Sequence, residues 1–501
     1  MSTAPVLEST TSPVTFDNRY ARLPKPFFVR MNPTPVASPR LRALNTGLCG
    51  ELGIDPGALS EDAWAQALAG NAVLPGSEPL AMAYAGHQFG HFVPQLGDGR
   101  ALLLGEVVDR AGVRRDIQLK GAGPTPFSRM GDGRAALGPV LREYLLSEAM
   151  HAMGVSTTRA LAMVTTGETV YREEPLPGAV LTRVAQSHIR VGTFQFFAAR
   201  RDPAAVKSLA DHVIERHYPE VRQASSPYLA LLESIAGRQA ELVARWMLVG
   251  FIHGVMNTDN MAVSGETIDY GPCAFMDTYH PGTVFSSIDQ RGRYAFANQP
   301  EIAQWNLARL AETLLPLIDD DASRAIDQAT QVLEAFPSSI STHWLAGMRD
   351  KLGLQTKEDS DLELVRELLD IMRKQEADFT LTFRYLSDLA AGEEVHTRVR
   401  SLFNHAQPFD VWLPCWQARV AREPHGAGER GARMRRVNPG YIPRNHRVEQ
   451  AIRAAVSEAD FGPFEHLLGL VTQPFQDHPG QESFMQPARP EERVHQTFCG
   501  T

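Results

Sequence analysis

The sequence predicts an α+β fold with a small β-rich lobe at residues 81–182 and a helical lobe at residues 183–350. Short apolar runs at 102–106 and 117–120 are bounded by Gly and charged residues, which is typical of a small antiparallel sheet. Residues 239–250 instead place apolar side chains at helical spacing, and the pattern beyond about residue 300 is mostly helical. We expect an N-terminal extension at 1–80 and a helical C-terminal extension at 351–501 around these lobes.

Prolines dominate the start of the chain. Five of them lie between Pro24 and Pro39 and forbid long regular structure, so residues 1–80 are predicted to wrap on the body. The next motif, Gly97-Asp98-Gly99-Arg100, is typical of a tight turn, because Gly supplies positive φ and Asp tolerates it. It also suits a phosphate cradle, in which backbone N–H groups approach an anion and Arg100 adds charge. The residues alone leave both interpretations open.

A second Gly-rich region begins at Lys120-Gly121-Ala122-Gly123, continues at Gly131-Asp132-Gly133-Arg134 and precedes a helix predicted from about Pro139 to Met153. Glu143 or Glu148 on this helix could reach back to Lys120, as the Lys of a kinase's third strand pairs with the Glu of the following helix. The alternative is a solvated lysine at the end of a strand.

The segment from Phe251 to Asp269 carries the strongest chemical signal. A buried helix leads into it, and a short hairpin predicted at 261–269 would present Asn260 and Asp269 side by side. Kinase-like folds hold Mg²⁺ with such an Asn and Asp, both hard oxygen ligands. The position of the kinase base is Val255, which cannot accept a proton, so Asp259 is the nearby carboxylate left for that role. The competing interpretation is an ordinary loop in which Asn and Asp form turns.

Composition excludes several classes of protein. A net charge of −9 gives no electrostatic footprint for nucleic acid, and no apolar run approaches the roughly 18 to 20 residues that span a bilayer. The N-terminus has neither a basic n-region nor an apolar h-region. We therefore expect a cytoplasmic protein with no nucleic-acid or membrane partner. Ser360 with Glu363 predicts the start of a helix in the C-terminal extension.

Four cysteines without a C-x-x-C motif argue against a disulfide framework and a structural zinc site. Cys49 and Cys415 are interpreted as structural. Cys273 follows Asp269 closely and Cys499 lies third from the end of the chain, so the two are either unreactive thiols or a redox pair able to clamp the metal loop.

Long strings of the sequence resemble one family. They include Y-A-G-H-Q-F-G-H-F from Tyr84, L-K-G-A-G-P-T-P-F-S-R from Leu119, H-G-V-M-N-T-D-N-M from His253, I-D-Y-G-P-C-A-F-M-D from Ile268 and V-N-P-G-Y-I-P-R-N from Val437. Together with shorter matches over nearly the whole chain, they resemble the selenoprotein O group, also called the YdiU family, in its bacterial, cysteine-containing form. The resemblance implies a protein-kinase-like two-lobed fold. Eukaryotic relatives carry selenocysteine near the C-terminus, where this chain has Cys499.

The resemblance also implies an activity, namely transfer of AMP from ATP to Ser, Thr or Tyr hydroxyls of proteins, with the nucleotide reversed relative to kinases. UMP transfer from UTP is left open, as is the choice of Mg²⁺ or Mn²⁺ and whether the chain itself is an acceptor. By position, the proton acceptor is Asp259, the metal ligands are Asn260 and Asp269, and Glu143 is the partner of Lys120. The nucleotide-contacting residues are Gly97, Gly99, Arg100, Lys120, Asp132, Gly133, Arg183, Arg190 and Asp269.

Physical reasoning agrees with this assignment. Reversal would point the α-phosphorus at the acceptor hydroxyl and leave the departing pyrophosphate among Lys120, Arg183 and Arg190. Asp259 would take the hydroxyl proton, and the metal would neutralise charge on the phosphate oxygens. Two alternatives remain, which are phosphoryl transfer by a kinase with a displaced base and a non-catalytic ATP-binding scaffold.

Overall fold

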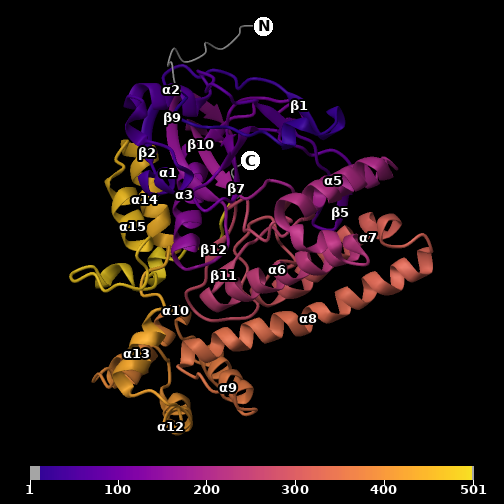
Figure 1. The fold of residues 1–501 in the computed structure, drawn as a ribbon. Helices are drawn as coiled ribbons and strands as arrows, with labels where there is room; N and C mark the ends of the chain where they lie inside the picture. The colour runs from indigo at the N-terminus through magenta and orange to yellow at the C-terminus, as the bar shows by residue number, and fades with distance from the viewer. Residues whose placement is uncertain (1–11, 499–501) are drawn as a thin grey trace.

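The computed structural model describes residues 12–498 and has an α+β fold built on one main sheet (Figure 1). The paired strands of this sheet are antiparallel. In spatial order they are β1 (Phe28–Arg30), β3 (Leu80–Met82), β6 (Ala101–Val108), β7 (Arg114–Lys120), β10 (Pro175–Ala185), β9 (Arg159–Tyr171) and β2 (Arg40–Leu44), with β8 (Ala135–Ala136) on β10. The strands predicted at 102–106 and 117–120 are confirmed as β6 and β7.

The N-terminal segment forms both edges of this sheet. β1 pairs with β3, and β2 pairs with β9, so residues expected to be an extension are part of the sheet. In chain order, α1 (Thr46–Leu52) and α2 (Glu61–Ala69) come after β2 and before β3. Helix α2 packs on β2 and β9. The prolines of this segment are compatible with short edge strands, because an edge strand leaves half of its backbone groups unpaired in any case.

All three expected domain boundaries fall inside elements. The boundary at 80/81 cuts β3, and the boundary at 182/183 cuts β10. The boundary at 350/351 cuts α8 (Ala322–Leu352). The β-rich part therefore continues to Ala185 at least, and Arg183 belongs to the sheet.

Helix α3 (Leu137–Ala152) packs on β9 and β10, where a helix was predicted. Its other neighbours come from the far end of the chain, since α14 (Asn445–Glu458) and α15 (Gly462–Val471) pack against it (Figure 1). The rings of Tyr144 on α3 and Phe464 on α15 lie 5.7 Å apart, and Arg142 donates a hydrogen bond to Glu449 on α14. The C-terminal segment thus returns to support the sheet.

Helices make up most of the remainder. α6 (Pro227–Val249), α7 (Gln299–Ile318) and α8 pack on one another, with α4 (Val191–Ala198) and α5 (Pro203–His217) nearby (Figure 1). The predicted buried helix before the 251–269 loop is confirmed as α6, although it begins earlier, at Pro227, because proline is favourable in the first turn of a helix. It leads into β11 (Phe251–Ile252), which pairs with β12 (Ala274–Phe275).

The hairpin predicted at 261–269 does not form. Ala262 bridges to Arg190, and Thr267 bridges to Thr157, so the two halves of this segment pair with other parts of the chain. Only the turn is present, with Gly265 at φ +78° and its N–H donating to the Ala262 carbonyl at 3.2 Å. The prediction was wrong because partners distant in sequence satisfy these backbone groups.

The C-terminal extension is helical, as predicted, and has its own apolar cluster around Phe379, Trp412 and Trp416. Its helices are α9 (Asp361–Lys374), α10 (Phe379–Ala390), α11 (His396–Arg400), α12 (Gln407–Val420) and α13 (Ala427–Arg435), followed by α14 and α15. The helix predicted at Ser360 is confirmed, although the Ser360 side chain makes no capping hydrogen bond. No helix within residues 12–498 combines the length and apolarity needed to cross a membrane.

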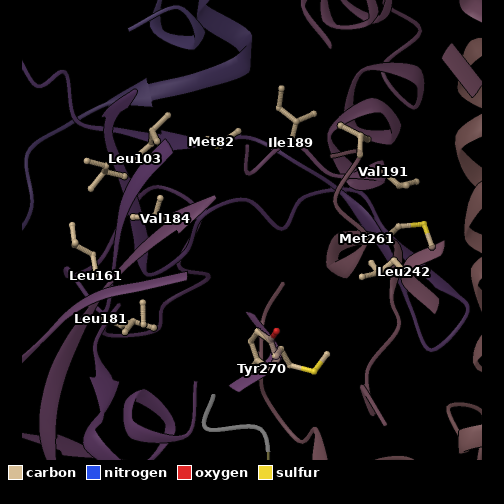
Figure 2. Close-up of a cluster of buried hydrophobic side chains, with 14 of the residues drawn as sticks. Met82, Leu103, Leu161, Leu181, Val184, Ile189, Val191, Leu242, Met261 and Tyr270 are labelled. Atoms are coloured by element: carbon tan, nitrogen blue, oxygen red, sulfur yellow. The ribbon is translucent and has the colours of Figure 1, made fainter. Parts of the chain in front are cut away.

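One hydrophobic core joins the sheet to the first helices. Figure 2 shows part of it, with Leu103 and Leu181 from the sheet, and Leu242 of α6 near Met261 of the loop that follows. These residues belong to a single cluster of buried side chains. The sheet and the loop after α6 are therefore held together, and the site lies where they meet.

Candidate active site

A cavity of about 740 Å³ opens between the sheet and the loop at 255–272. Ten residues singled out from the sequence line it, namely Gly97, Gly99, Arg100, Lys120, Asp132, Gly133, Arg183, Asp259, Asn260 and Asp269. Three other predicted site residues lie outside the cavity lining, namely Glu143, Arg190 and Cys273. Of these, Glu143 contacts Lys120 and Arg190 contacts Asp269, both of which line the cavity. Residues far apart in sequence thus meet in one cavity of a size that suits a nucleotide.

Asp269 is the centre of an ion cluster in this cavity. Its Oδ1 accepts hydrogen bonds from Lys120 Nζ at 2.9 Å and Arg183 Nη1 at 2.6 Å. Its Oδ2 lies 3.3 Å from Arg190 Nη1. Burial alone would raise the pKa of Asp269, but these three cations hold it well below its usual value. The ionised form of Asp269 is therefore the favoured one in this cluster.

The sheet and α3 position the cations. Lys120 at the end of β7 pairs with Leu181 of β10, and Arg183 lies two residues further along β10. The two cations are therefore on neighbouring strands. Glu143 of α3 accepts from Lys120 Nζ at 2.6 Å and from Arg183 Nη1 at 3.2 Å. The predicted pairing of Lys120 is thus confirmed for Glu143, whereas Glu148 binds Arg159 at 2.8 Å.

Three cations meet in this cluster. In its ion pairs Lys120, Arg183 and Arg190 contact two carboxylates, Glu143 and Asp269, and all five side chains are largely buried, so their charges are weakly screened. The nearby carboxylates Asp98 and Asp259 also interact electrostatically with Arg190. Lys120 and Arg183 line the cavity, where such cations can bind phosphate oxygens.

Asp259 occupies a buried position beside the cluster. The residue is 8 % exposed, its Oδ1 has no hydrogen-bond partner among residues 12–498, and its Oδ2 lies 3.5 Å from Gln88 Nε2. Burial raises the pKa of Asp259 to about 6. A carboxylate with an unoccupied acceptor oxygen and a pKa near neutrality is suited to accept a proton.

The loop that carries Asp259 is held by β4 (Gly86–Gln88). His87 N–H donates to Thr258 Oγ1 at 2.7 Å, and Phe89 N–H donates to Asn257 Oδ1 at 2.9 Å. A Cβ on Gly86 would lie 2.7 Å from Asp259 Oδ1, so only glycine allows this close approach.

The amide of Asn260 is held by its own loop. Its Nδ2 donates to the Val255 carbonyl at 2.8 Å, which fixes the amide and leaves Oδ1 as an available acceptor. No group of three or more His, Cys, Asp or Glu side chains suited to a metal occurs in the described part of the chain. Asn260 and Asp269 supply oxygen ligands of the kind that Mg²⁺ or Mn²⁺ binds, with water and phosphate oxygens to complete the shell. Because both Asp269 oxygens also contact cations of the cluster, an ion bound there would share this carboxylate with them.

Two glycine-containing loops form the outer wall of the cavity. Gly97 has φ +73°, and a Cβ there would lie 2.3 Å from the Phe127 ring. Gly133 has φ +66°, and a Cβ there would lie 2.1 Å from the Gly123 carbonyl. The tight turn predicted at 97–100 is confirmed, because Gly97 has positive φ and the Gly99 N–H donates to the Gly97 carbonyl at 2.8 Å; the segment leads into β6. Asp132 is partly exposed and accepts from Arg172 at 2.8 and 3.1 Å.

Sequence reasoning missed two residues that support Arg183. Gln118 is fully buried, its Oε1 accepts from Arg183 Nε at 2.6 Å, and its Nε2 donates to Asp98 Oδ2 at 3.1 Å. Asp98 also accepts from the Met82 N–H at 3.1 Å. The available signal was spacing, because Gln118 lies two residues before Lys120 and shares its face of the strand.

Comparison with known proteins identifies the family. The model of the family described as "Protein adenylyltransferase SelO" matches residues 11–472. The chain belongs to the SelO family. Among its relatives, proteins named "Protein nucleotidyltransferase YdiU" are 62 % identical over 498 residues in Rhizobium rhizogenes, covering 99 % of both chains, and 63 % identical over 486 residues in Rhizobium meliloti, covering 97 % of this chain and 99 % of the relative. A third, from Bradyrhizobium diazoefficiens, is 61 % identical over 486 residues, with the same coverage.

The cysteines of this SelO family member differ in their surroundings. Cys273 is buried, and its carbonyl accepts from Arg142 Nη1 at 3.1 Å. Thr497 donates a hydrogen bond to the Pro272 carbonyl and bridges to Ser286, which places the end of the described chain beside the loop after Asp269. Cys499 lies outside the described residues, so its pairing with Cys273 stays a prediction. Cys49 is buried, in keeping with a structural role, whereas Cys415 is exposed, so its burial gives no support for such a role.

Proposed function

We propose that this chain transfers AMP from ATP to Ser, Thr or Tyr hydroxyls of proteins and releases pyrophosphate. Membership of a family described as protein adenylyltransferases supports the reaction class. The observation that carries the proposal is the placement of Asp259 beside Asn260 and next to three clustered cations, with an Oδ1 that has no hydrogen-bond partner within residues 12–498. A base, an oxygen-ligand pair and a polyphosphate site thus share one cavity.

We also propose that the architecture is that of a two-lobed, protein-kinase-like fold with the nucleotide reversed. The main sheet with α3 would form the first lobe, and the helices from α4 to α8 would form the second. The Lys120–Glu143 pair and the order of helix, loop, Asn260 and Asp269 support this arrangement. Reversal is supported by the cations, since Lys120 and Arg183 at the buried end suit the departing pyrophosphate.

The chain's own residues account for the bond changes. The acceptor hydroxyl oxygen bonds to the α-phosphorus, the bond from that phosphorus to the oxygen bridging the β-phosphate breaks, and pyrophosphate leaves with its negative charge. Asp259 takes the hydroxyl proton. Lys120, Arg183 and Arg190 stabilise the charge on the leaving group. A divalent ion held by Asn260 and Asp269 would neutralise charge on the phosphate oxygens when bound.

The test is incubation with Mg²⁺ and ATP labelled at either the α- or the γ-phosphate. We expect protein labelled from the α-position alone, with loss of label in Asp269→Ala and retention in Asp320→Ala, an exposed carboxylate outside the cavity. Label from the γ-position would show a kinase. Bound ATP with no transfer to any acceptor would contradict the proposed reaction.

A further inference from the structure

A short hairpin connects Asp259 to the protein surface. Strands β4 and β5 (His91–Val93) pair, and Phe89 and Gly90 at the turn have φ +51° and +85°. The turn end of this hairpin lines the cavity through Gln88 and Phe89, and Gln88 contacts Asp259. Phe92 lies opposite His87 in the strand pairing and is 40 % exposed. The hairpin therefore joins the cavity wall beside Asp259 to an exposed aromatic residue.

An arginine lies directly against the tip of this hairpin. A Cβ on Gly90 would lie 3.8 Å from the guanidinium carbon of Arg293. The ring of Tyr294, the next residue, is 5.1 Å from that of Phe89, and its hydroxyl donates to Asn257 Oδ1 at 2.6 Å. Arg293 is thus fixed to the loop that carries Asp259.

Trp305 on α7 holds this arginine and a second one. The guanidinium of Arg293 lies 4.9 Å from the Trp305 ring, and that of Arg309 lies 5.1 Å from it. His87 of the hairpin contacts both Trp305, with ring centres 5.2 Å apart, and Phe92, at 5.0 Å. In Figure 1, β5 lies beside α7 accordingly. We call Phe92, Arg293, Trp305 and Arg309 the acceptor-side surface.

The charges on this surface are only partly compensated. Arg293 forms no ion pair with any residue in 12–498, and the Nε atoms of Arg293 and Arg309 are buried without a hydrogen-bond partner in that range. Arg309 pairs with Glu312 at 2.8 Å, but Glu312 is half exposed. Asp289, which precedes Arg293 in the chain, already accepts the N–H groups of Arg293 at 2.9 Å and Tyr294 at 2.7 Å.

We propose that the acceptor-side surface docks the protein substrate through an acidic segment next to the acceptor hydroxyl. The inference rests on the proposed function, because an acceptor protein must reach Asp259. The chain as a whole carries −9, so an acidic partner is repelled in general and needs a local positive surface. Arginines stacked on an aromatic ring lose little freedom when they bind a carboxylate, and the exposed Phe92 adds apolar contact.

The experiment compares two synthetic peptides with the same Ser, Thr and Tyr residues, flanked by Glu in one and by Lys in the other. The full-length protein is supplied with Mg²⁺ and α-labelled ATP, and kcat/KM for each peptide, KM for ATP and pyrophosphate release are measured. The variant is Arg293→Glu. The matched control is Arg453→Glu, an exposed arginine on α14, which lies away from β5 across the sheet in Figure 1.

We expect the unaltered protein to prefer the Glu-flanked peptide by about tenfold in kcat/KM, equivalent to about 1.4 kcal/mol. Arg293→Glu should reverse this preference with KM for ATP unchanged, and Arg453→Glu should keep it. A gain with the Lys-flanked peptide cannot arise from misfolding. Equal labelling of both peptides, or an unchanged preference in Arg293→Glu, would overturn the docking surface alone. Absence of both pyrophosphate release and label on any acceptor would overturn the proposed function and the docking surface together.

Discussion

Replacement of Gln118 by leucine should weaken catalysis although the Gln118 side chain does not line the cavity. The side chain is buried between Asp98 and Arg183 and hydrogen-bonds to both. Leucine has a similar volume, so packing is largely kept while both bonds are lost. Arg183 would then lose the partner that fixes its Nε and could rotate away from Asp269 and the leaving group.

The size of the effect follows from these contacts. A hydrogen bond to a charged group contributes about 1.5–3 kcal/mol. If Arg183 needs this bond to stabilise the leaving group, kcat/KM for ATP falls by about 10- to 150-fold, because each 1.36 kcal/mol of barrier is tenfold in rate. The free energy of unfolding should also fall, since Asp98 loses its hydrogen bond from Gln118 Nε2.

The assay is transfer of α-label with ATP varied, beside thermal unfolding of the same samples. The matched control is Gln304→Leu, which removes an amide bond to the Leu333 carbonyl outside the cavity and should leave the ATP kinetics unchanged. The reasoning is refuted if Gln118→Leu melts at a lower temperature but retains the kcat/KM of the unaltered protein. Gln118 would then contribute to stability alone.

Three further predictions concern single residues. Burial raises the pKa of Asp259 to about 6, so the base form is present above that pH and lost below it, and kcat/KM should rise through about pH 6. Asp259→Asn should lower kcat by about 10²–10⁴-fold while ATP still binds. A flat pH profile would count against Asp259 as the base. Gly133→Ala should raise KM for ATP at least about tenfold, because the new Cβ would meet the Gly123 carbonyl. The control is Gly112→Ala, which also has positive φ but lies in open space. Equal KM values for the two variants would contradict the close packing at Gly133. Burial lowers the pKa of Lys351 to about 7, so between pH 7 and about 10 the unfolded chain binds a proton that the folded chain lacks, and stability rises with pH. Lys351→Met should therefore raise the free energy of unfolding by about 2 kcal/mol at pH 7, once the loss of the Lys351 contact with the Phe383 ring at 4.3 Å has been subtracted. This gain should be smaller at pH 9. A gain that stays constant with pH would refute the cost of the buried charge.

The order of elements along the chain predicted which residues belong to the site better than it predicted how those residues are arranged in space. Lys120 at a strand end, a helix with Glu143 after it, and the loop to Asp269 are local features, and the structure joins them as expected. Gln118 escaped notice because a buried amide has no distinctive sequence pattern. Its role depends on the register of β7 with β10, which places it opposite Arg183.

Long-range pairing explains the wrong predictions. The 261–269 segment has the turn of a hairpin, but Ala262 and Thr267 pair with residues that the sequence does not place near them. The edge strands β1 and β2 were missed for the same reason, since short runs among prolines become strands only when β3 and β9 offer partners. The helices and the central strands β6 and β7 were predictable from local pattern, whereas strands that depend on a distant partner were not.

The packing of α14 and α15 on α3 has a consequence for synthesis in the cell. α3 carries Glu143 and also Arg142, which bonds to the carbonyl of Cys273, so the last two α-helices support the same helix that holds the ion cluster. A ribosome adds about 5–20 residues per second, so the roughly 200 residues from Asp269 to the end of α15 take about 10–40 s. During this interval the nascent chain already contains every residue of the ion cluster but lacks the helices that support α3. Premature termination before residue 445 should therefore yield polypeptides that contain these residues without a stable enzyme.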